Sequence, residues 1–406
     1  MNAKCFLLMA VWAGLGGAVP PIFAQTWITA ANAPLTNWSS IASSADGTRL
    51  VAAAGLITAQ PVWNINNPAA PIYVSTNGGA TWTNTTAPLS TWQSVACSAD
   101  GSRLAAVSAQ GWVYTSSDGG GAWASNNLPT GITWSAVTSS ADGTKLAIAG
   151  SGSGIYISAN GGTNWSPSDA PATNWTGLAS SADGSRMVAV QAGDYLHFNG
   201  SIYTSTNAGT NWWLTTAPAA EWFSVASSAD GSRLAATAFH INSLGPGPIY
   251  LSTNAGLTWA PSGAPPEYWN SIASSADGSK LVAAGNGALY TSADFGATWA
   301  ASSVPYLYWR CATSSADGSK LAVLASQIYT AASPPTPWLN PTLTGGGLVL
   351  SWTLPSTNLV LQQNSDLASA NWRDVAAIAT LTTTTLQYQV TLPLTNRQGF
   401  YRLQSR

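Results

Sequence analysis

Short apolar runs alternate with polar turns along most of this chain, in an order that keeps recurring. The run "SIAS" at 40–43 precedes an Asp-Gly pair, "LVAAA" at 50–54 follows it, and "IYVST" comes at 72–76. A second turn, "NGGA" at 77–80, then leads into Thr81 and Trp82. Runs of this length between turn residues are typical of β-strands. The pattern therefore predicts units of four short strands.

Seven such units follow one another. Each opens on a Trp and continues to an Asp-Gly turn, and the turn aspartates are Asp46, Asp100, Asp142, Asp183, Asp230, Asp277 and Asp317. Their mean spacing is about 45 residues, which is the length of one four-stranded propeller blade. We predict an all-β fold in which residues 25–333 form a seven-bladed β-propeller.

The second turn of each unit belongs to a longer box, "STNGGATW" at Ser75–Trp82, and close copies return five more times. In the box, Asn77 can bond the amides of its own turn and Gly79 permits the backbone reversal. Trp82 then covers the sheet. The Asp-Gly pair is likewise a strong hairpin signal. Turn chemistry explains both motifs without a ligand.

The seventh unit lacks a box, because "IYTAAS" at 328–333 has neither the turn nor the Trp. The N-terminal stretch "QTWITAANAPLTNW" at 25–38 matches the end of a box-bearing unit. We predict that this N-terminal strand closes the last blade, which would also remove an exposed edge.

The two ends of the chain differ from the repeats. Residues 1–24 carry Lys4, an apolar stretch and "IFA" before Gln25, as a secretory signal peptide does. We predict an exported protein, secreted or periplasmic. Residues 334–340 form a Pro-rich linker, and the strand-like runs of residues 341–406 predict a small C-terminal β-sandwich.

Composition excludes several partners. Charged residues make up 7% of the chain, its formal net charge is −2, and no basic cluster occurs, so nucleic acid is excluded as a partner and membrane insertion is not expected. After signal cleavage only Cys97 and Cys311 remain, at different repeat positions in units that are not neighbours, and no disulfide is predicted. We expect a monomer.

Removing the residues that the repeat explains leaves few candidates for function. Both turns of each unit lie on one face of the disc, so the variable loops between second and third strands, and the linkers between blades, lie on the other. The predicted ligand-binding residues on that face are Trp63, Asn66, Asp194, Tyr195, His197, His240, Glu267 and Tyr268.

These residues leave alternatives open. Trp63 and Tyr195 either stack on a sugar ring or bury their loops against the disc. His197 and His240 with Asp194 are a weak signal for a metal, so we predict no metal and no cofactor.

The six boxes fit the pattern Ser-x-(Asp/Asn)-x-Gly-x-x-Trp, and residues 25–333 resemble the Asp-box (BNR-type) β-propeller superfamily. That superfamily includes sialidases, xyloglucan-active hydrolases, sortilin-type receptors and photosystem II assembly propellers, so the resemblance implies a fold and no single activity. Its sialidases have six blades and hold a carboxylate with three arginines, whereas Arg310 is the one propeller arginine outside the Asp-Gly turns here. The C-terminal region resembles β-sandwich modules appended to exported bacterial proteins.

The favoured hypothesis is a non-catalytic binding or scaffold protein whose ligand is an uncharged polysaccharide or a protein. The alternative is a glycoside hydrolase that uses a carboxylate pair on the loop face, with Asp194 and Glu221 as candidates. Xyloglucan-active enzymes of the resembling superfamily place their site between two propellers, and this chain has one.

Overall fold

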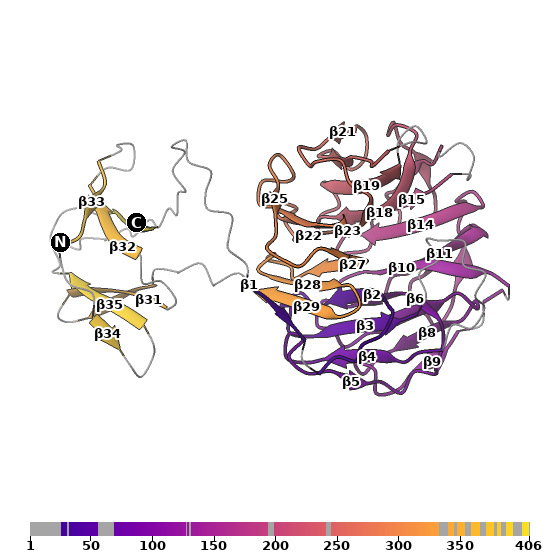
Figure 1. Cartoon of the computed structure of the whole chain (residues 1–406), viewed down its shortest axis with the longest axis horizontal. Helices are drawn as coiled ribbons and strands as arrows, with labels where there is room; N and C mark the ends of the chain where they lie inside the picture. Colours follow the sequence, from indigo (N-terminus) through magenta and orange to yellow (C-terminus); the bar gives the residue numbers. More distant parts are fainter. Residues whose placement is uncertain are drawn as a thin grey trace, which may run out of the picture. The chain divides into compact units, whose positions relative to one another are not determined.

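The structure is a computed structural model that describes residues 26–30, 32–55, 69–126, 128–129, 131–193, 199–240, 245–332, 340–344, 347–353, 359–365, 371–376, 380–382, 387–392 and 400–405. The chain divides into two compact units, Ala24–Ala332 and a unit that includes Ser333–Arg406 (Figure 1). Every regular element in the described part is a β-strand, and no helix there could span a membrane. The predicted signal peptide, residues 1–24, and linker residues 334–339 lie outside the described residues.

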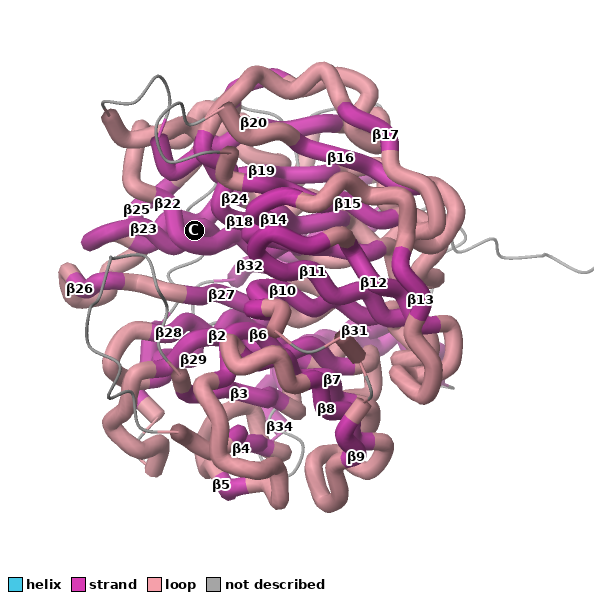
Figure 2. Tube along the Cα trace, turned by 90° about the vertical axis from the view of Figure 1, so that its right-hand side faces the viewer, coloured by secondary structure: helices cyan, strands magenta, loops and turns pink. Residues whose placement is uncertain are grey.

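The strands of the larger unit pair in antiparallel sets of four. Six sets are consecutive in the chain: β2 (Trp38–Ser43), β3 (Leu50–Ala54), β4 (Ile72–Ser75) and β5 (Thr83–Asn84); β6 (Trp92–Cys97), β7 (Leu104–Ser108), β8 (Val113–Ser116) and β9 (Ala124–Ser125); β10 (Thr133–Ser139), β11 (Leu146–Ser153), β12 (Ile155–Ser158) and β13 (Ser166–Pro167); β14 (Thr173–Ser180), β15 (Met187–Gln191), β16 (Ile202–Ser205) and β17 (Trp213–Leu214); β18 (Glu221–Ser227), β19 (Leu234–His240), β20 (Ile249–Ser252) and β21 (Ala260–Pro261); β22 (Trp269–Ser274), β23 (Leu281–Gly287), β24 (Leu289–Ser292) and β25 (Ala300–Ala301). In Figure 2 the first strands β2, β6, β10, β14 and β18 lie toward the middle of the unit and the fourth strands β5, β9, β13 and β17 at its rim, which is a propeller arrangement.

The closing set combines the two ends of the unit. It contains β27 (Cys311–Ser314), β28 (Lys320–Leu324) and β29 (Ile328–Ala332), and β1 (Thr26–Thr29) pairs antiparallel with β29. The Ala30 N–H also donates to the Ile328 carbonyl at 2.9 Å. The predicted closure by the N-terminal strand is confirmed.

The sheet count differs from the seven separate blades that the sequence predicts. Hydrogen bonding gives five separate sheets and one eight-stranded sheet, in which the sets β10–β13 and β14–β17 are joined. The cause is the length of β11, whose last residues run past β12 and pair with β14, Ser151 opposite Asn174 and Ser153 opposite Thr173. The spacing of the repeats carries no information about hydrogen bonding between the strands of neighbouring sets.

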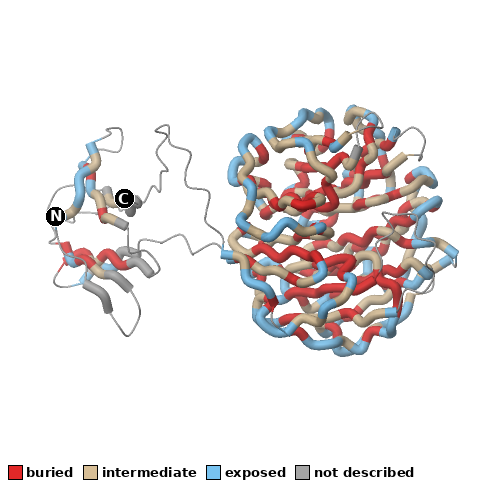
Figure 3. The backbone as a smooth tube through the Cα atoms, in the orientation of Figure 1, coloured by how far each residue is buried: buried red, intermediate tan, exposed pale blue. Residues whose placement is uncertain are grey.

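Aromatic packing between strands explains why these sequences form sheets. The seven Trp that open the units are buried, with exposed fractions of 1% or less, and each packs edge-on against the Tyr of a third strand. The Trp38 and Tyr73 ring centroids, for example, are 5.2 Å apart with the planes at 70°. Edge-to-face contacts of this kind add to the hydrophobic stabilisation. The Trp that open the units are core residues, as predicted, and the repeated Tyr are half-buried against them. Buried stretches follow the strands in Figure 3.

The smaller unit contains two small sheets. One is ordered β30 (Asn340–Thr344), β31 (Gly347–Thr353), β35 (Gln387–Leu392) and β34 (Thr380–Thr382), and the other β33 (Arg373–Asp374), β32 (Leu359–Asn364) and β36 (Phe400–Ser405). One apolar cluster includes Leu350 and Val390 of the first sheet and Leu361 of the second. The β-sandwich itself stays a prediction.

Candidate ligand-binding site

The polar atoms of both repeated motifs are used within the fold. In the first Asp-Gly turn the Asp46 carboxylate accepts hydrogen bonds from the Ser44 hydroxyl at 2.6 Å and the Thr48 N–H at 2.9 Å. These bonds lower the pKa of Asp46 from 3.8 to about 2. In the adjoining box, the Thr81 N–H donates to Asn77 Oδ1 and the Trp82 indole donates to the Gly79 carbonyl. These polar atoms of the box are thus used within its own turn.

A ring of backbone hydrogen bonds joins the seven Asp-Gly turns. The N–H of the Ala before each Asp donates to the carbonyl of the corresponding Ala in the next turn, at 2.7 Å throughout, and Ala316 donates back to Ala45. The basic residue of each turn lies over the Gly of the next, as Lys320 does over Gly47. Lys320 Nζ also donates to the Asp46 carbonyl at 2.8 Å. The sequence predicted only the hairpin turn and missed this contact between turns.

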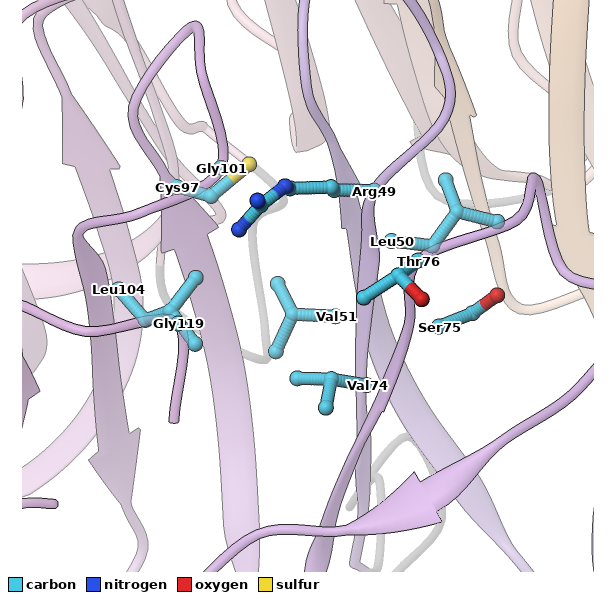
Figure 4. A pocket seen from close by; sticks show the side chains of 10 residues that line it. All are labelled: Arg49, Leu50, Val51, Val74, Ser75, Thr76, Cys97, Gly101, Leu104 and Gly119. Atoms are coloured by element: carbon cyan, nitrogen blue, oxygen red, sulfur yellow. The ribbon is translucent and has the colours of Figure 1, made fainter. Parts of the chain in front are cut away.

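The clefts at the end of the sheets that carries the Asp-Gly turns and the boxes are lined mainly by residues of the repeat. A cavity of about 20 Å³ between the sets β2–β5 and β6–β9 has room for about one water molecule (Figure 4). The Arg49 side chain extends across it toward Cys97, whose burial raises the pKa of the thiol to about 12. A wider cleft of about 640 Å³ lies where the closing set lacks a box, and repeat residues such as Leu50, Gly79 and Thr330 line it.

At the opposite end of the sheets, linkers between sets contact the hairpins that join second to third strands. Three isolated bridges make this contact, Ala70 with Ser90, Gly200 with Ala220, and Gly247 with Glu267. The described residues at the ends of these hairpins and the linkers therefore share one end of the unit, which we call the hairpin face.

Only some of the predicted site residues lie within the described part of the chain. Trp63, Asn66, Asp194, Tyr195 and His197 lie outside the described residues. The backbone of His240 ends β19 opposite Glu221, the alternative catalytic residue, which begins β18. Glu267 and Tyr268 are half-buried, and Glu267 exchanges two backbone hydrogen bonds with Gly247, of 3.2 and 3.3 Å.

Tyr268 belongs to a row of aromatic side chains on this face. Its ring centroid is 5.3 Å from that of Phe239, and Phe239 is 5.5 Å from Phe223. The interplanar angles are 48° and 32°, and all three side chains are half-buried. The row connects β18, β19 and the start of β22, so two neighbouring sets contribute to it.

The positions on either side of the repeated Trp show that this end of the propeller is not uniform. In four sets they hold only uncharged polar residues, namely Asn37, Ser39, Thr91, Gln93, Thr133, Ser135, Asn174 and Thr176. In the other three they hold a carboxylate, aromatic rings, an amide and a guanidinium, namely Glu221, Phe223, Tyr268, Asn270, Tyr308 and Arg310. These six residues form the candidate site. Aligning the positions next to the repeated Trp could have found it from the sequence.

Hydrogen bonds hold part of this site in place. Asn270 is buried, and its Nδ2 donates at 2.7 Å both to the Trp309 carbonyl and to Asn286 Oδ1. Arg310 lies with its Cζ 5.7 Å from the centre of the Tyr308 ring, a cation–π contact. In the described part of the chain no group of three or more His, Cys, Asp and Glu side chains is arranged to hold a metal ion. The site offers aromatic surface and hydrogen-bonding groups.

No protein-family model and no curated protein matches this chain. Solved structures match its fold. YCF48 from Cyanidioschyzon merolae matches with a TM-score of 0.57 and 14% identity, over 75% of this chain and 98% of that chain. A structure of YCF48 bound to D1 peptide matches with a TM-score of 0.56 and 17% identity, over 77% of this chain and 96% of that chain.

A GH74 xyloglucanase from Xanthomonas campestris matches with a TM-score of 0.59 and 14% identity, over 81% of this chain and 59% of that chain. At such identities the similarity shows the β-propeller fold alone, and that fold serves both a peptide-binding protein and a glycoside hydrolase.

Proposed function

We propose that this chain is an exported, non-catalytic binding protein of the Asp-box propeller type, and that its ligand docks on the hairpin face at the candidate site. The observation that carries the proposal is the asymmetry around the repeated Trp, because packing alone would favour similar residues in every set. Aromatic and polar residues that depart from a rigid repeat are typical of a binding surface.

The charges at this site support a ligand without strong charge. Glu221 in the site and Glu267 next to Tyr268 contribute carboxylates, and the guanidinium of Arg310 lies against the Tyr308 ring. Aromatic surface with hydrogen-bonding groups suits the hydroxyls of an uncharged polysaccharide, and a protein partner is the second choice.

Purified full-length mature protein, exposed to a panel of oligosaccharides, tests this proposal when binding and product release are recorded together. We expect binding without product. Tyr268→Ala should weaken it about tenfold, as truncation of an aromatic anchor does. Asn37→Ala, at the matching position of another set, should leave binding unchanged.

A glycoside hydrolase is the second candidate, since Glu221 and Glu267 lie at the starts of neighbouring sets on this face. Product release that is abolished by Glu221→Gln would replace the binding proposal with this one. Binding to none of the sugars would contradict the polysaccharide ligand.

A further inference from the structure

Tyr306 combines high exposure with a fixed position. Its side chain is 83% exposed, and it lies three residues before the repeated Trp309, in the linker that leads from the set β22–β25 to the closing set. Aromatic side chains in a monomeric fold normally lose most of their surface to the core. An aromatic ring that stays in water while held in place is therefore a candidate contact for a ligand.

Three features hold the Tyr306 ring. The linker strand β26 (Leu307–Tyr308) pairs with the end of β23, Asn286 opposite Tyr308 and Gly287 opposite Leu307. The Tyr306 hydroxyl donates to the Asn286 carbonyl at 3.2 Å. A Cβ on Gly287 would overlap the Tyr306 ring, so the ring lies directly on the glycine backbone. Binding to a ring that is already placed costs little conformational entropy.

Gly287 is the residue that this arrangement needs. Its φ is +128°, a region that L side chains rarely adopt, and any side chain would displace the tyrosine. With a glycine at this position, one face of the Tyr306 ring lies on the backbone and the rest of the side chain is exposed to solvent.

We propose that Tyr306 is a stacking platform for one pyranose ring of a neutral polysaccharide, beside Tyr308, which is 43% exposed. This inference rests on the proposed function and assigns it a subsite. A pyranose ring presents C–H groups on its face and hydroxyls at its edge, which matches an aromatic face bordered by polar groups. The Glu267 side chain passes beside Gly285, two residues before Gly287, and adds a carboxylate that accepts hydrogen bonds from hydroxyls, while the Arg310 guanidinium beside Tyr308 donates them.

Titration calorimetry on the full-length mature protein with cellohexaose, mannohexaose and xylohexaose tests this platform, with oligogalacturonate as the acidic comparison. We expect at least one neutral hexasaccharide to bind and oligogalacturonate not to bind. Tyr306→Ala should weaken binding about tenfold, whereas Tyr306→Phe, which keeps the ring, should lose much less.

Leu35→Ala is the matched control, because Leu35 also lies three residues before a repeated Trp and is 74% exposed. It should leave binding unchanged. Proton NMR gives a readout that a purely structural role would not produce: ring-current shifts of sugar C–H protons should appear with the wild type and disappear with Tyr306→Ala. Melting temperatures establish that each variant is folded.

The outcomes separate the two proposals. Equal binding by the wild type and Tyr306→Ala would overturn the platform and leave the proposed function standing. Binding of oligogalacturonate in preference to neutral sugars would also overturn the platform. No binding of any sugar by the wild type would overturn the platform and the polysaccharide ligand, and would point to the protein ligand.

Discussion

No turn connects the N-terminal strand β1 to its partner β29. A substitution in β1 can therefore measure how much this strand contributes to the stability of the closing set. The change we consider is Trp27→Ala. Trp27 is half-buried and packs against the apolar cluster that contains Leu289 and Trp309. It also lies opposite Ala331 in the pairing of β1 with β29. Removing its ring therefore weakens both the packing and the attachment of this strand.

The expected magnitude follows from burial. Truncating a buried Trp to Ala costs about 3–5 kcal/mol, and for a half-buried ring we expect a loss of about 2 kcal/mol in the free energy of unfolding. Trp123 provides a matched control, since it too is half-buried and packs against an apolar cluster. Trp123→Ala should cost a similar amount. The strand β9 that follows Trp123, however, is joined to β8 through a box, so local detachment is restrained.

Denaturant unfolding and hydrogen exchange together test this reasoning. Both variants should lose similar stability, but only Trp27→Ala should speed exchange of the amides in Ile328–Ala332, by about tenfold for a local opening made about 1.4 kcal/mol easier. Equal exchange of this segment in wild type and Trp27→Ala would show that β1 does not hold the closing set through Trp27.

Three further outcomes are expected. Six turn aspartates have pKa values lowered from 3.8 to about 2, so their carboxylates stabilise the fold above pH 3.8, and this stabilisation is lost as the pH falls toward 2. The free energy of unfolding, followed by circular dichroism, should decrease between these two pH values. A free energy of unfolding that stays constant over this interval would contradict the prediction. Gly47→Ala should lower the melting temperature, because φ is +66° and a Cβ would lie 2.8 Å from Lys320 Cδ, whereas Gly245→Ala, with open space around it, should not. Cys97 and Cys311 are free and half-buried, and desolvation raises their thiol pKa values, so Ellman's reagent should react with both much more slowly in the native protein than after unfolding. Equally rapid labelling of the native protein would refute this.

Much of the fold could be predicted because the repeat is strict. Asp-Gly turns, boxes and the Trp that opens each unit give strand order, and the missing seventh box gave the partner of β1. Local turn chemistry and apolar runs carry this information, and each needs only a few consecutive residues. The joined sheets β10–β17 could not be predicted in the same way, since they depend on how far β11 extends beside β14.

The candidate site, too, could be predicted only in part from the sequence. Glu267 and Tyr268 were found by removing the repeated residues, but Phe223 and Asn270 were not, because each lies inside a strand motif that looked structural. Only the folded chain brings the Phe239 ring within about 5.5 Å of both Phe223 and Tyr268. Their separation in sequence hides a contact that depends on neighbouring sets.

The sequence by itself determined the all-β class, the four-strand unit and the closure of the first strand on the last. Those follow from periodicity and turn residues, which act over short distances. The tertiary structure alone decided the ring of hydrogen bonds from Ala45 through Ala316, and the placement of the Tyr306 ring on Gly287. Both depend on how closely separate segments approach, and that distance is set by packing of the whole unit.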